Sequence, residues 1–228
     1  MKKLVVLCMA SWIFSCQESF EVPVPATGEA YYPLDSNWVR EYEISEIDYK
    51  ISGFDTSHYF LRERTGGLLY QEGEEASYQL IREKRLLATD DWQMDSIWVV
   101  RTAPGRLVTV KNNVPEVTLV FPVTAGTTWD LYAFASRNEK LVSYRNVDPN
   151  EWEGKNGFSR DSMIQVVIDD LPANIIEQRQ SVEFYAAGIG LIEKKSIVLA
   201  FCINACDSAN QIDNGKYFSQ KLVNYGKR

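Results

Sequence analysis

Apolar and aromatic residues in this 228-residue chain recur mainly at every second position, in short segments. Successive side chains of a β-strand point to opposite faces, so a period of two is typical of strands that bury one face. Turn residues separate the segments at hairpin spacing, as in "TGGL", "APGR" and "KNNVPE". The alternation therefore predicts an all-β chain of antiparallel strands.

Twelve segments fit this pattern: residues 38–49, 57–64, 77–87, 95–101, 106–111, 116–123, 128–136, 139–147, 162–169, 180–186, 190–200 and 217–225. No linker rich in Pro, Gly or Ser divides them, so we expect one domain over residues 31–228. The predicted architecture is a strongly curved meander sheet, barrel-like in form, and a two-sheet sandwich is the alternative.

The first segment changes its apolar side along its length. In "VREYEISEIDYK", Tyr42 and Ile44 share one face, whereas Ile47 and Tyr49 share the other. A β-bulge or strong bend near Glu46 would reconcile the two halves. We expect such a distortion to help the sheet curl.

The N-terminus has the parts of a secretory signal. Two lysines precede an apolar run over residues 4–14 and the small residue Ser15. This run is shorter than the roughly 17 to 25 residues that a membrane-spanning helix needs. Residues 1–15 are therefore predicted to be a signal peptide.

The end of this signal, "IFSC", resembles a bacterial lipobox with Cys16 as the lipid acceptor. The resemblance implies a mature chain that begins at Cys16 and is held in the membrane by its acyl chains. Residues 16–30 contain Pro23 and Pro25 and read as an extended tether. We expect an outer membrane lipoprotein, either on the periplasmic face or at the cell surface.

Charge and cysteine usage agree with this compartment. The formal net charge of −7 disfavours a nucleic-acid partner on electrostatic grounds. Cys202 and Cys206, in "FCINACDS", are predicted to form a short-loop disulfide, and two free thiols are the alternative. His58 is the only histidine, so the ligands of a typical soft-metal site are missing and no metal is expected.

Catalytic signatures are not found. The sequence has no G-x-S-x-G elbow, P-loop or dinucleotide-binding fingerprint. The acid pairs at 90–91 and 169–170 are adjacent, and neighbours on a strand point to opposite faces. We predict no catalytic residue and no cofactor. A hydrolase that uses His58 with a serine, or two converging carboxylates, remains an alternative.

Three tryptophans are candidates for binding. Trp92, Trp98 and Trp152 lie beside polar or charged residues, where an exposed ring can stack on a sugar or anchor a peptide. The alternative is that these rings cap the core of the sheet.

Three stretches resemble a group of uncharacterised Bacteroidota lipoproteins. They are "YYPLDSNWVREYEI" from residue 31, "FPVTAGTTWD" from residue 121 and "EFYAAGIGLIEKK" from residue 183. The resemblance implies a shared β fold without an established activity.

Together these features predict a lipid-anchored protein of the bacterial envelope, a non-enzymatic binding or structural accessory module. The alternatives are a carbohydrate- or peptide-binding surface lipoprotein, a carrier of an apolar ligand, and a hydrolase. A glycan, a peptide or an envelope protein would be the partner, and the oligomeric state is left open. The contents of the concave face of the sheet separate these hypotheses, because a packed interior argues against a carrier.

Overall fold

The computed structural model describes residues 28–147, 162–203 and 211–227. In these residues a short 3-10 helix, η1 (Glu29–Tyr31), precedes twelve strands. They are β1 (Trp38–Lys50), β2 (Gly53–Glu72), β3 (Glu75–Arg85), β4 (Gln93–Ala103), β5 (Arg106–Lys111), β6 (Val114–Val120), β7 (Thr128–Asp130), β8 (Leu141–Arg145), β9 (Met163–Leu171), β10 (Glu177–Ala186), β11 (Gly190–Phe201) and β12 (Ile212–Lys227). None of the described helical segments is long and apolar enough to cross a membrane.

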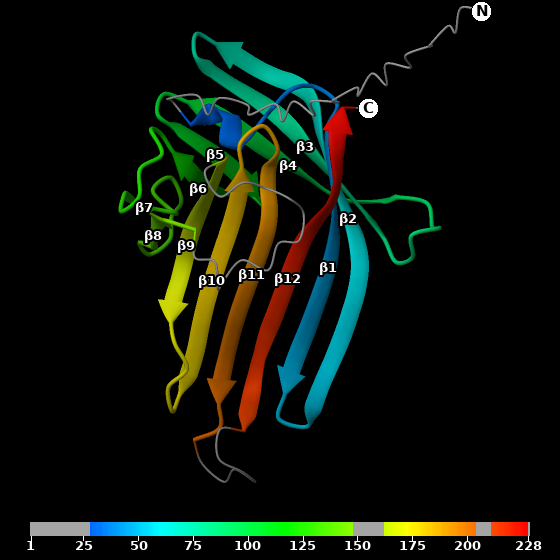
Figure 1. Cartoon of the computed structure of the whole chain (residues 1–228), viewed down its shortest axis with the longest axis vertical. Coiled ribbons are helices and arrows are strands. Elements are labelled where there is room, and N and C mark those ends of the chain that lie inside the picture. Colours follow the sequence, from blue (N-terminus) through cyan, green and yellow to red (C-terminus); the bar gives the residue numbers. More distant parts are fainter. Residues whose placement is uncertain (1–27, 148–161, 204–210, 228) are drawn as a thin grey trace, which may run out of the picture.

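The described strands form a single antiparallel sheet in the order β6-β5-β4-β3-β2-β1-β12-β11-β10-β9-β8-β7. The first and last strands of the chain therefore lie side by side in the middle of the sheet. The sheet curls until its two end strands, β6 and β7, approach each other as a nearly closed barrel (Figure 1). The predicted curved antiparallel meander is confirmed, and the sandwich alternative is wrong because there is one sheet.

Two aromatic side chains fasten the ends of the sheet. Trp129 on β7 donates its indole N–H to the Val117 carbonyl of β6 at 2.7 Å. The hydroxyl of Tyr144 on β8 accepts a hydrogen bond from the Val120 N–H at 3.0 Å and donates to the Val120 carbonyl at 2.9 Å. The Val117 N–H also donates to the Leu131 carbonyl. Backbone groups that would otherwise line an open edge are thus paired.

The barrel interior is largely filled by apolar side chains. Tyr31 and Tyr32, at and just after η1, are buried at its upper end, where Figure 1 shows η1 beside the strand ends. The core around them consists of Leu80, Val100, Leu107, Val108, Val117, Leu119, Trp129, Val142, Tyr144, Ile164, Val166 and Tyr185. A second cluster contains Tyr42, Ile44, Leu61, Met163, Phe184, Ala186, Ile189, Ile192 and Leu222.

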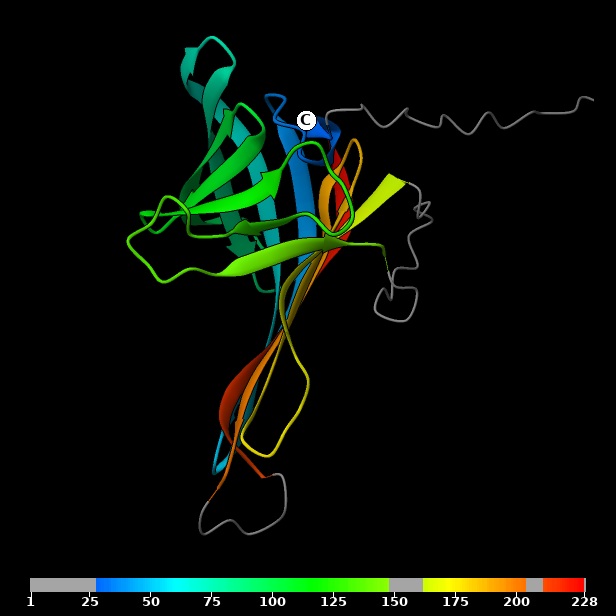
Figure 2. The ribbon, with the colours of Figure 1, turned by 90° about the vertical axis from the view of Figure 1, so that its left-hand side faces the viewer.

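Six strands are longer than the barrel wall requires. Figure 2 shows that β1, β2 and β9–β12 continue below the barrel as a single layer. We call this layer the sheet extension. It explains why β2 begins at Gly53, before the predicted segment 57–64, whereas the other end of β2 runs on to Glu72 in a hairpin with β3.

The predicted bulge near Glu46 is wrong. The pairing of β1 with β2 is regular through this point, and the register shift between β1 and β12 lies at Glu41/Tyr42. Tyr42 and Ile44 are fully buried, whereas Ile47 is only half-buried on the opposite face. The apolar side switches because the strand leaves the barrel there and enters the sheet extension.

The predicted strand 128–136 is also too long, since β7 ends at Asp130. The Asp130 carboxylate accepts hydrogen bonds from the backbone N–H groups of Tyr132 at 3.0 Å and Lys140 at 2.8 Å. These bonds hold the chain in a turn, as Asp side chains commonly do.

Candidate binding cavity

A cavity of about 190 Å³ lies at the lower end of the barrel, above the sheet extension that Figure 2 shows. Residues from six strands and from the segment after β7 surround it: Lys111, Glu116, Thr118, Leu131, Tyr132, Val142, Val166, Ile168, Ser181, Glu183, Lys194 and Ser196. The lining therefore comes from both ends of the sheet, and the cavity depends on the closure of the barrel.

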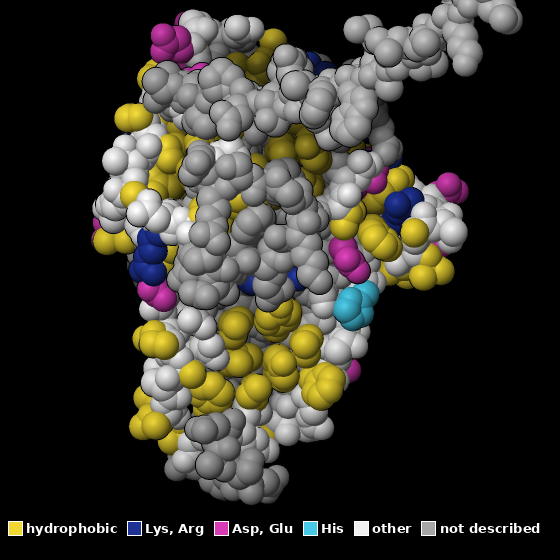
Figure 3. Space-filling model, viewed as in Figure 1, with side chains coloured by type: hydrophobic (Ala, Val, Ile, Leu, Met, Phe, Trp, Pro, Cys, Tyr) yellow, Lys and Arg dark blue, Asp and Glu magenta, His cyan; other side chains and the backbone are white. Residues whose placement is uncertain are grey.

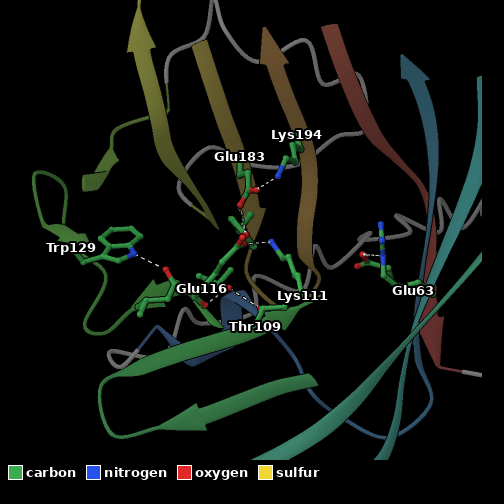
Figure 4. Close-up of polar contacts among 11 residues, drawn as sticks. Glu63, Thr109, Lys111, Glu116, Trp129, Glu183 and Lys194 are labelled. Atoms are coloured by element: carbon green, nitrogen blue, oxygen red, sulfur yellow. Dashed lines mark hydrogen bonds and ion pairs between the residues drawn. The ribbon is translucent and has the colours of Figure 1, made fainter. Parts of the chain in front are cut away.

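Two ion pairs form its polar wall. Lys111 and Glu116, in the β5–β6 hairpin, approach to 2.7 Å between Nζ and Oε2. Lys194 on β11 lies directly opposite Glu183 on β10, with 2.7 Å between Nζ and Oε1. Figure 4 shows the two pairs close together, from strands on opposite sides of the barrel.

Local sequence explains the first pair. Asn112 and Asn113 have φ angles of 50° and 63°, which asparagine tolerates better than most residues. Such angles build the tight turn that matches the twist of paired strands. The turn brings Lys111 and Glu116, five residues apart, onto one face.

The charges of the second pair stabilise each other. Burial opposes ionisation of Glu183, but Lys194, Lys111 and a hydrogen bond donated by the Tyr185 hydroxyl outweigh it and hold the pKa of Glu183 at about 2. Burial lowers the pKa of Lys194, yet Glu183 and Glu116 more than compensate and raise it. Both groups are therefore charged at neutral pH.

The rest of the lining is partly apolar. Leu131, Val142, Val166 and Ile168 contribute to it, with Val166 directly beside Glu183 in the register, and Thr118, Ser181 and Ser196 add hydroxyl groups. The cavity offers ammonium and hydroxyl donors, carboxylate acceptors and one hydrophobic surface. Its four charges sum to zero. This arrangement suits a small neutral molecule that both donates and accepts hydrogen bonds.

A second pocket of about 630 Å³ lies at the upper end of the barrel. It is lined by Glu29, Tyr32, Pro33, Leu34, Glu74, Thr102, Ala103, Pro104, Gly105, Arg106, Leu107 and Phe121. Much of this lining comes from turns and from the segment around η1. It lacks the facing ion pairs that order the lower cavity.

Of the predicted binding tryptophans, the two that the structure describes, Trp92 and Trp98, line neither pocket. Trp98 packs against the barrel core, with the Arg82 guanidinium 3.8 Å and the Lys111 ammonium 5.2 Å from its ring. The Trp92 ring lies between Arg62 and Arg85, at 4.6 and 4.2 Å. The Trp98 ring thus lies against the ammonium group of Lys111, which is a residue of the cavity. Trp152 lies outside the described residues.

The first and third of the three family-like stretches contact each other. Trp38 and Arg40 both donate hydrogen bonds to the Ile189 carbonyl, at 3.2 and 3.3 Å, and the Tyr42 hydroxyl donates to the Leu191 carbonyl at 3.1 Å. The first stretch is therefore fastened to the β10–β11 hairpin of the third. Trp129, in the remaining stretch, closes the barrel. These aromatic residues have structural roles.

The other predicted sites are not brought together. His58 is exposed on β2 and lines neither pocket. Asp169 pairs with Lys140, and Asp170 pairs with Arg145. Among the described residues there is no group of three or more His, Cys, Asp and Glu side chains placed to hold a metal ion.

Of the two cysteines predicted to form a disulfide, the structure describes only Cys202. Cys202 follows β11, and its backbone N–H donates to the Gln211 carbonyl at 2.8 Å. Cys206 lies outside the described residues, so its disulfide with Cys202 stays a prediction. Cys16 also lies outside them, and so does the proposed tether up to residue 27.

The sequence pattern did not single out Lys111, Glu116, Glu183 and Lys194. A signal was present for the second pair, because "SVEFYAAGIGLIEKK" places Glu183 two residues before an aromatic side chain of the same face. Charge at an inward position of a buried strand indicates a polar interior. Their mutual approach depends on strand order, which the pattern alone does not fix.

The comparisons with known proteins are sparse. No protein-family model matches the chain, and no curated protein matches it. One similar solved structure is that of a Bacteroides fragilis protein described as exported, with a YmcC-like fold. It is 11% identical, with a TM-score of 0.41, and the match covers 86% of this chain and 98% of that one.

Proposed function

We propose that this chain is a lipid-anchored protein of the bacterial envelope that binds one small polar ligand in its barrel cavity without transforming it. The observation that carries the proposal is a cavity in which two ion pairs lie beside apolar side chains, next to the apolar core of the barrel. Such a space favours an uncharged ligand with hydroxyl groups on its rim and C–H groups on its face.

The size of the cavity limits the ligand. At about 190 Å³ it is smaller than the roughly 300 to 1,000 Å³ of pockets for drug-sized molecules. One sugar ring or a similar polyol matches that volume, and its hydroxyls can accept from lysines and donate to carboxylates. We therefore favour the carbohydrate-binding form of the hypothesis, with a ligand of one residue.

A carrier of an apolar ligand and a hydrolase both fit the cavity less well. An apolar ligand would leave Lys111, Glu116, Glu183 and Lys194 shielded from water without gaining hydrogen bonds, at a cost in free energy. A general acid must hold its proton near neutral pH, whereas Glu183 has a pKa of about 2. Its lysine partner keeps it ionised.

The position of the N-terminal end supports the anchor. The described chain begins at Gly28, beside η1 at the upper end of the barrel (Figure 1), and the residues that line the cavity lie farther along the strands, towards the sheet extension. Cys16 lies twelve positions before Gly28, a reach of up to about 40 Å. A lipid at Cys16 would leave the cavity pointing away from the membrane.

A thermal-shift panel of monosaccharides and related polyols on the full chain tests the binding proposal. A ligand at a hundredfold excess over its dissociation constant stabilises the folded state by about 2.7 kcal/mol. We expect at least one sugar to raise the Tm of the wild-type chain. The double variant Lys111→Met/Glu116→Gln, which removes one pair without leaving a lone charge, should lose that shift.

The matched control is Lys140→Met, since Lys140 also pairs with a carboxylate but lines neither pocket. It should keep the full shift. A panel without any stabilising sugar, or a shift that persists in the double variant, would contradict the proposal.

A further inference from the structure

The second pocket, which we call the upper pocket, is large enough for a whole organic molecule. Its volume of about 630 Å³ lies within the roughly 300 to 1,000 Å³ of small-molecule sites, whereas the barrel cavity lies below that range. The upper pocket and the barrel cavity share no lining residue. A ligand of the upper pocket would therefore be distinct from the proposed sugar.

Apolar side chains form much of the lining of the upper pocket. Tyr32 and Leu107 are buried, with exposed fractions of 8% and 2%, and Leu34 and Phe121 pack against the same core. Ala103 and two prolines add further apolar surface. Such a lining favours a ligand with an apolar body.

Backbone contacts hold two sides of the upper pocket in place. The Gly188 N–H donates to the Ala30 carbonyl in η1 at 2.8 Å, and the Phe121 N–H donates to the Gly105 carbonyl in the β4–β5 turn at 2.8 Å. Gly28 lies close against Phe121, because an added Cβ would be 3.2 Å from a carbon of its ring. The pocket is therefore formed before a ligand binds, which lowers the entropic cost of binding.

The charged side chains of the upper pocket are two carboxylates and one guanidinium. Glu29 on η1 and Glu74 in the β2–β3 turn form no hydrogen bond or ion pair through their carboxylates with the rest of the described chain. The Arg106 guanidinium lies 5.4 Å from the centre of the Phe134 ring, which does not line the pocket. Figure 3 shows acidic side chains at the top of the molecule, where Figure 1 places the β2–β3 hairpin. The lining therefore carries an excess of unpaired negative charge.

A positively charged ligand with an apolar body fits both features. An ammonium group forms strong hydrogen bonds to carboxylates and is attracted to the face of an aromatic ring such as Phe121. The net charge of −7 also raises the concentration of cations near the chain. We propose that the upper pocket binds a small organic cation, with its charged group beside Glu29 and Glu74 and its apolar body against Leu107 and Phe121.

Three probes that share an indole ring and a two-carbon linker test the charge of the ligand. Tryptamine ends in an ammonium group, tryptophol in a neutral hydroxyl and indole-3-propionate in a carboxylate. Isothermal titration calorimetry on the full chain measures their affinities. We expect tryptamine to bind at least about tenfold more tightly than tryptophol, and indole-3-propionate to bind more weakly than both.

Two double variants locate the binding. Glu29→Gln/Glu74→Gln removes both carboxylates of the lining and should lower the affinity for tryptamine to that for tryptophol. The matched control is Asp35→Asn/Glu72→Gln, which removes two negative charges from neighbouring segments that do not line the pocket. It should keep the wild-type affinity for tryptamine, because the change in net charge is the same and only the position differs.

Unfolding curves establish that both double variants fold, so that a loss of affinity reports on the pocket. Equal binding of the three probes, tightest binding of indole-3-propionate, no binding of tryptamine, or tryptamine binding that Glu29→Gln/Glu74→Gln retains would each overturn the proposal. The sugar panel gives a separate result, because the Tm shift with sugar depends on residues of the barrel cavity alone.

Discussion

Arg40 is fully buried where β1 passes the β10–β11 hairpin. Its guanidinium donates to the Ile189 carbonyl, lies 3.9 Å from the Glu63 carboxylate and sits 4.9 Å from the centre of the Tyr32 ring. Gly190 makes room for it, because a Cβ there would lie 2.7 Å from Arg40 Nη1, and the φ of +103° also favours glycine. One buried cation thus joins β1, β2 and the hairpin.

Replacement of Arg40 by alanine should destabilise the fold strongly. Removal of this fully buried side chain leaves a cavity, and Glu63 keeps only Arg82 of the described residues, at 3.2 Å, as its charged partner, so we expect a loss of about 2 to 5 kcal/mol. Urea unfolding measures this loss. Arg145→Ala is the control, because its pair with Asp170 is about half exposed and should contribute less than about 1 kcal/mol. Equal losses in the two variants would refute a special role for Arg40.

The buried pair at Glu183 predicts a pH dependence. The pKa of Glu183 is about 2 in the folded chain, below the ordinary value of 4.5 expected after unfolding. Its stabilisation is complete above about pH 4.5 and is lost as the pH falls towards 2, because the unfolded state takes up the proton first. The stability advantage of the wild type over Glu183→Gln should shrink by about 3 kcal/mol over that range.

Denaturant unfolding between pH 2 and 6 measures this difference. Glu177→Gln is the control, since Glu177 pairs with Arg179 at the surface. A wild-type advantage that stays constant with pH would show that the Glu183 carboxylate gains nothing from its lysine.

The short contact between β6 and β7 decides whether the sheet is a barrel. β7 has three residues and pairs with β8, so few contacts join this end of the sheet to β6. One is the backbone hydrogen bond from Val117 to Leu131; in addition Trp129 provides a buried hydrogen bond, and its ring packs 4.6 Å from the ring of Tyr144. Two aromatic residues therefore contribute a large part of the closure.

Trp129→Phe should loosen this closure. It keeps an aromatic ring but leaves the Val117 carbonyl without its donor, a loss of about 1 to 3 kcal/mol. Hydrogen exchange of the β6 amides should become faster while that of β1 and β12 changes little. Trp92→Phe, far from the closure, serves as control. Uniform acceleration throughout the sheet would contradict a local role.

The alternation of side chains predicted which segments form strands, but it did not predict where several of these strands end. The pattern located β1, β5 and β11 within a few residues. It failed at Asp130, where a side chain ends the strand through backbone hydrogen bonds, and at Glu46, where the apolar side changes because the barrel ends. Both depend on neighbours that are distant in sequence.

The molecule as a whole is a barrel with the start of the described chain at one end and a charged cavity at the other (Figure 1). Turn and alternation signals predicted the curved sheet, because every described strand except β6 pairs with the strand that follows it in the chain. They did not predict the cavity, since Lys111 and Lys194 meet only after β1 and β12 pair. Two of the tryptophans predicted to bind a ligand are engaged by arginine instead.

The proposed anchor predicts where the chain is found. Cys16→Ala should abolish incorporation of labelled palmitate and move the protein from the membrane fraction to the soluble envelope fraction. Cys202→Ala, with its cysteine elsewhere in the sequence, should leave the label unchanged. Palmitate uptake by the Cys16→Ala chain would place the lipid at another residue.

A crystal structure of the chain with the most stabilising sugar is the sharpest test of the binding proposal, because it locates the ligand. We predict density for one sugar residue between the Lys111–Glu116 and Lys194–Glu183 pairs, with its ring against Val142 and Val166. Density in the upper pocket or on the outer surface, with the barrel cavity holding only water, would contradict the proposal.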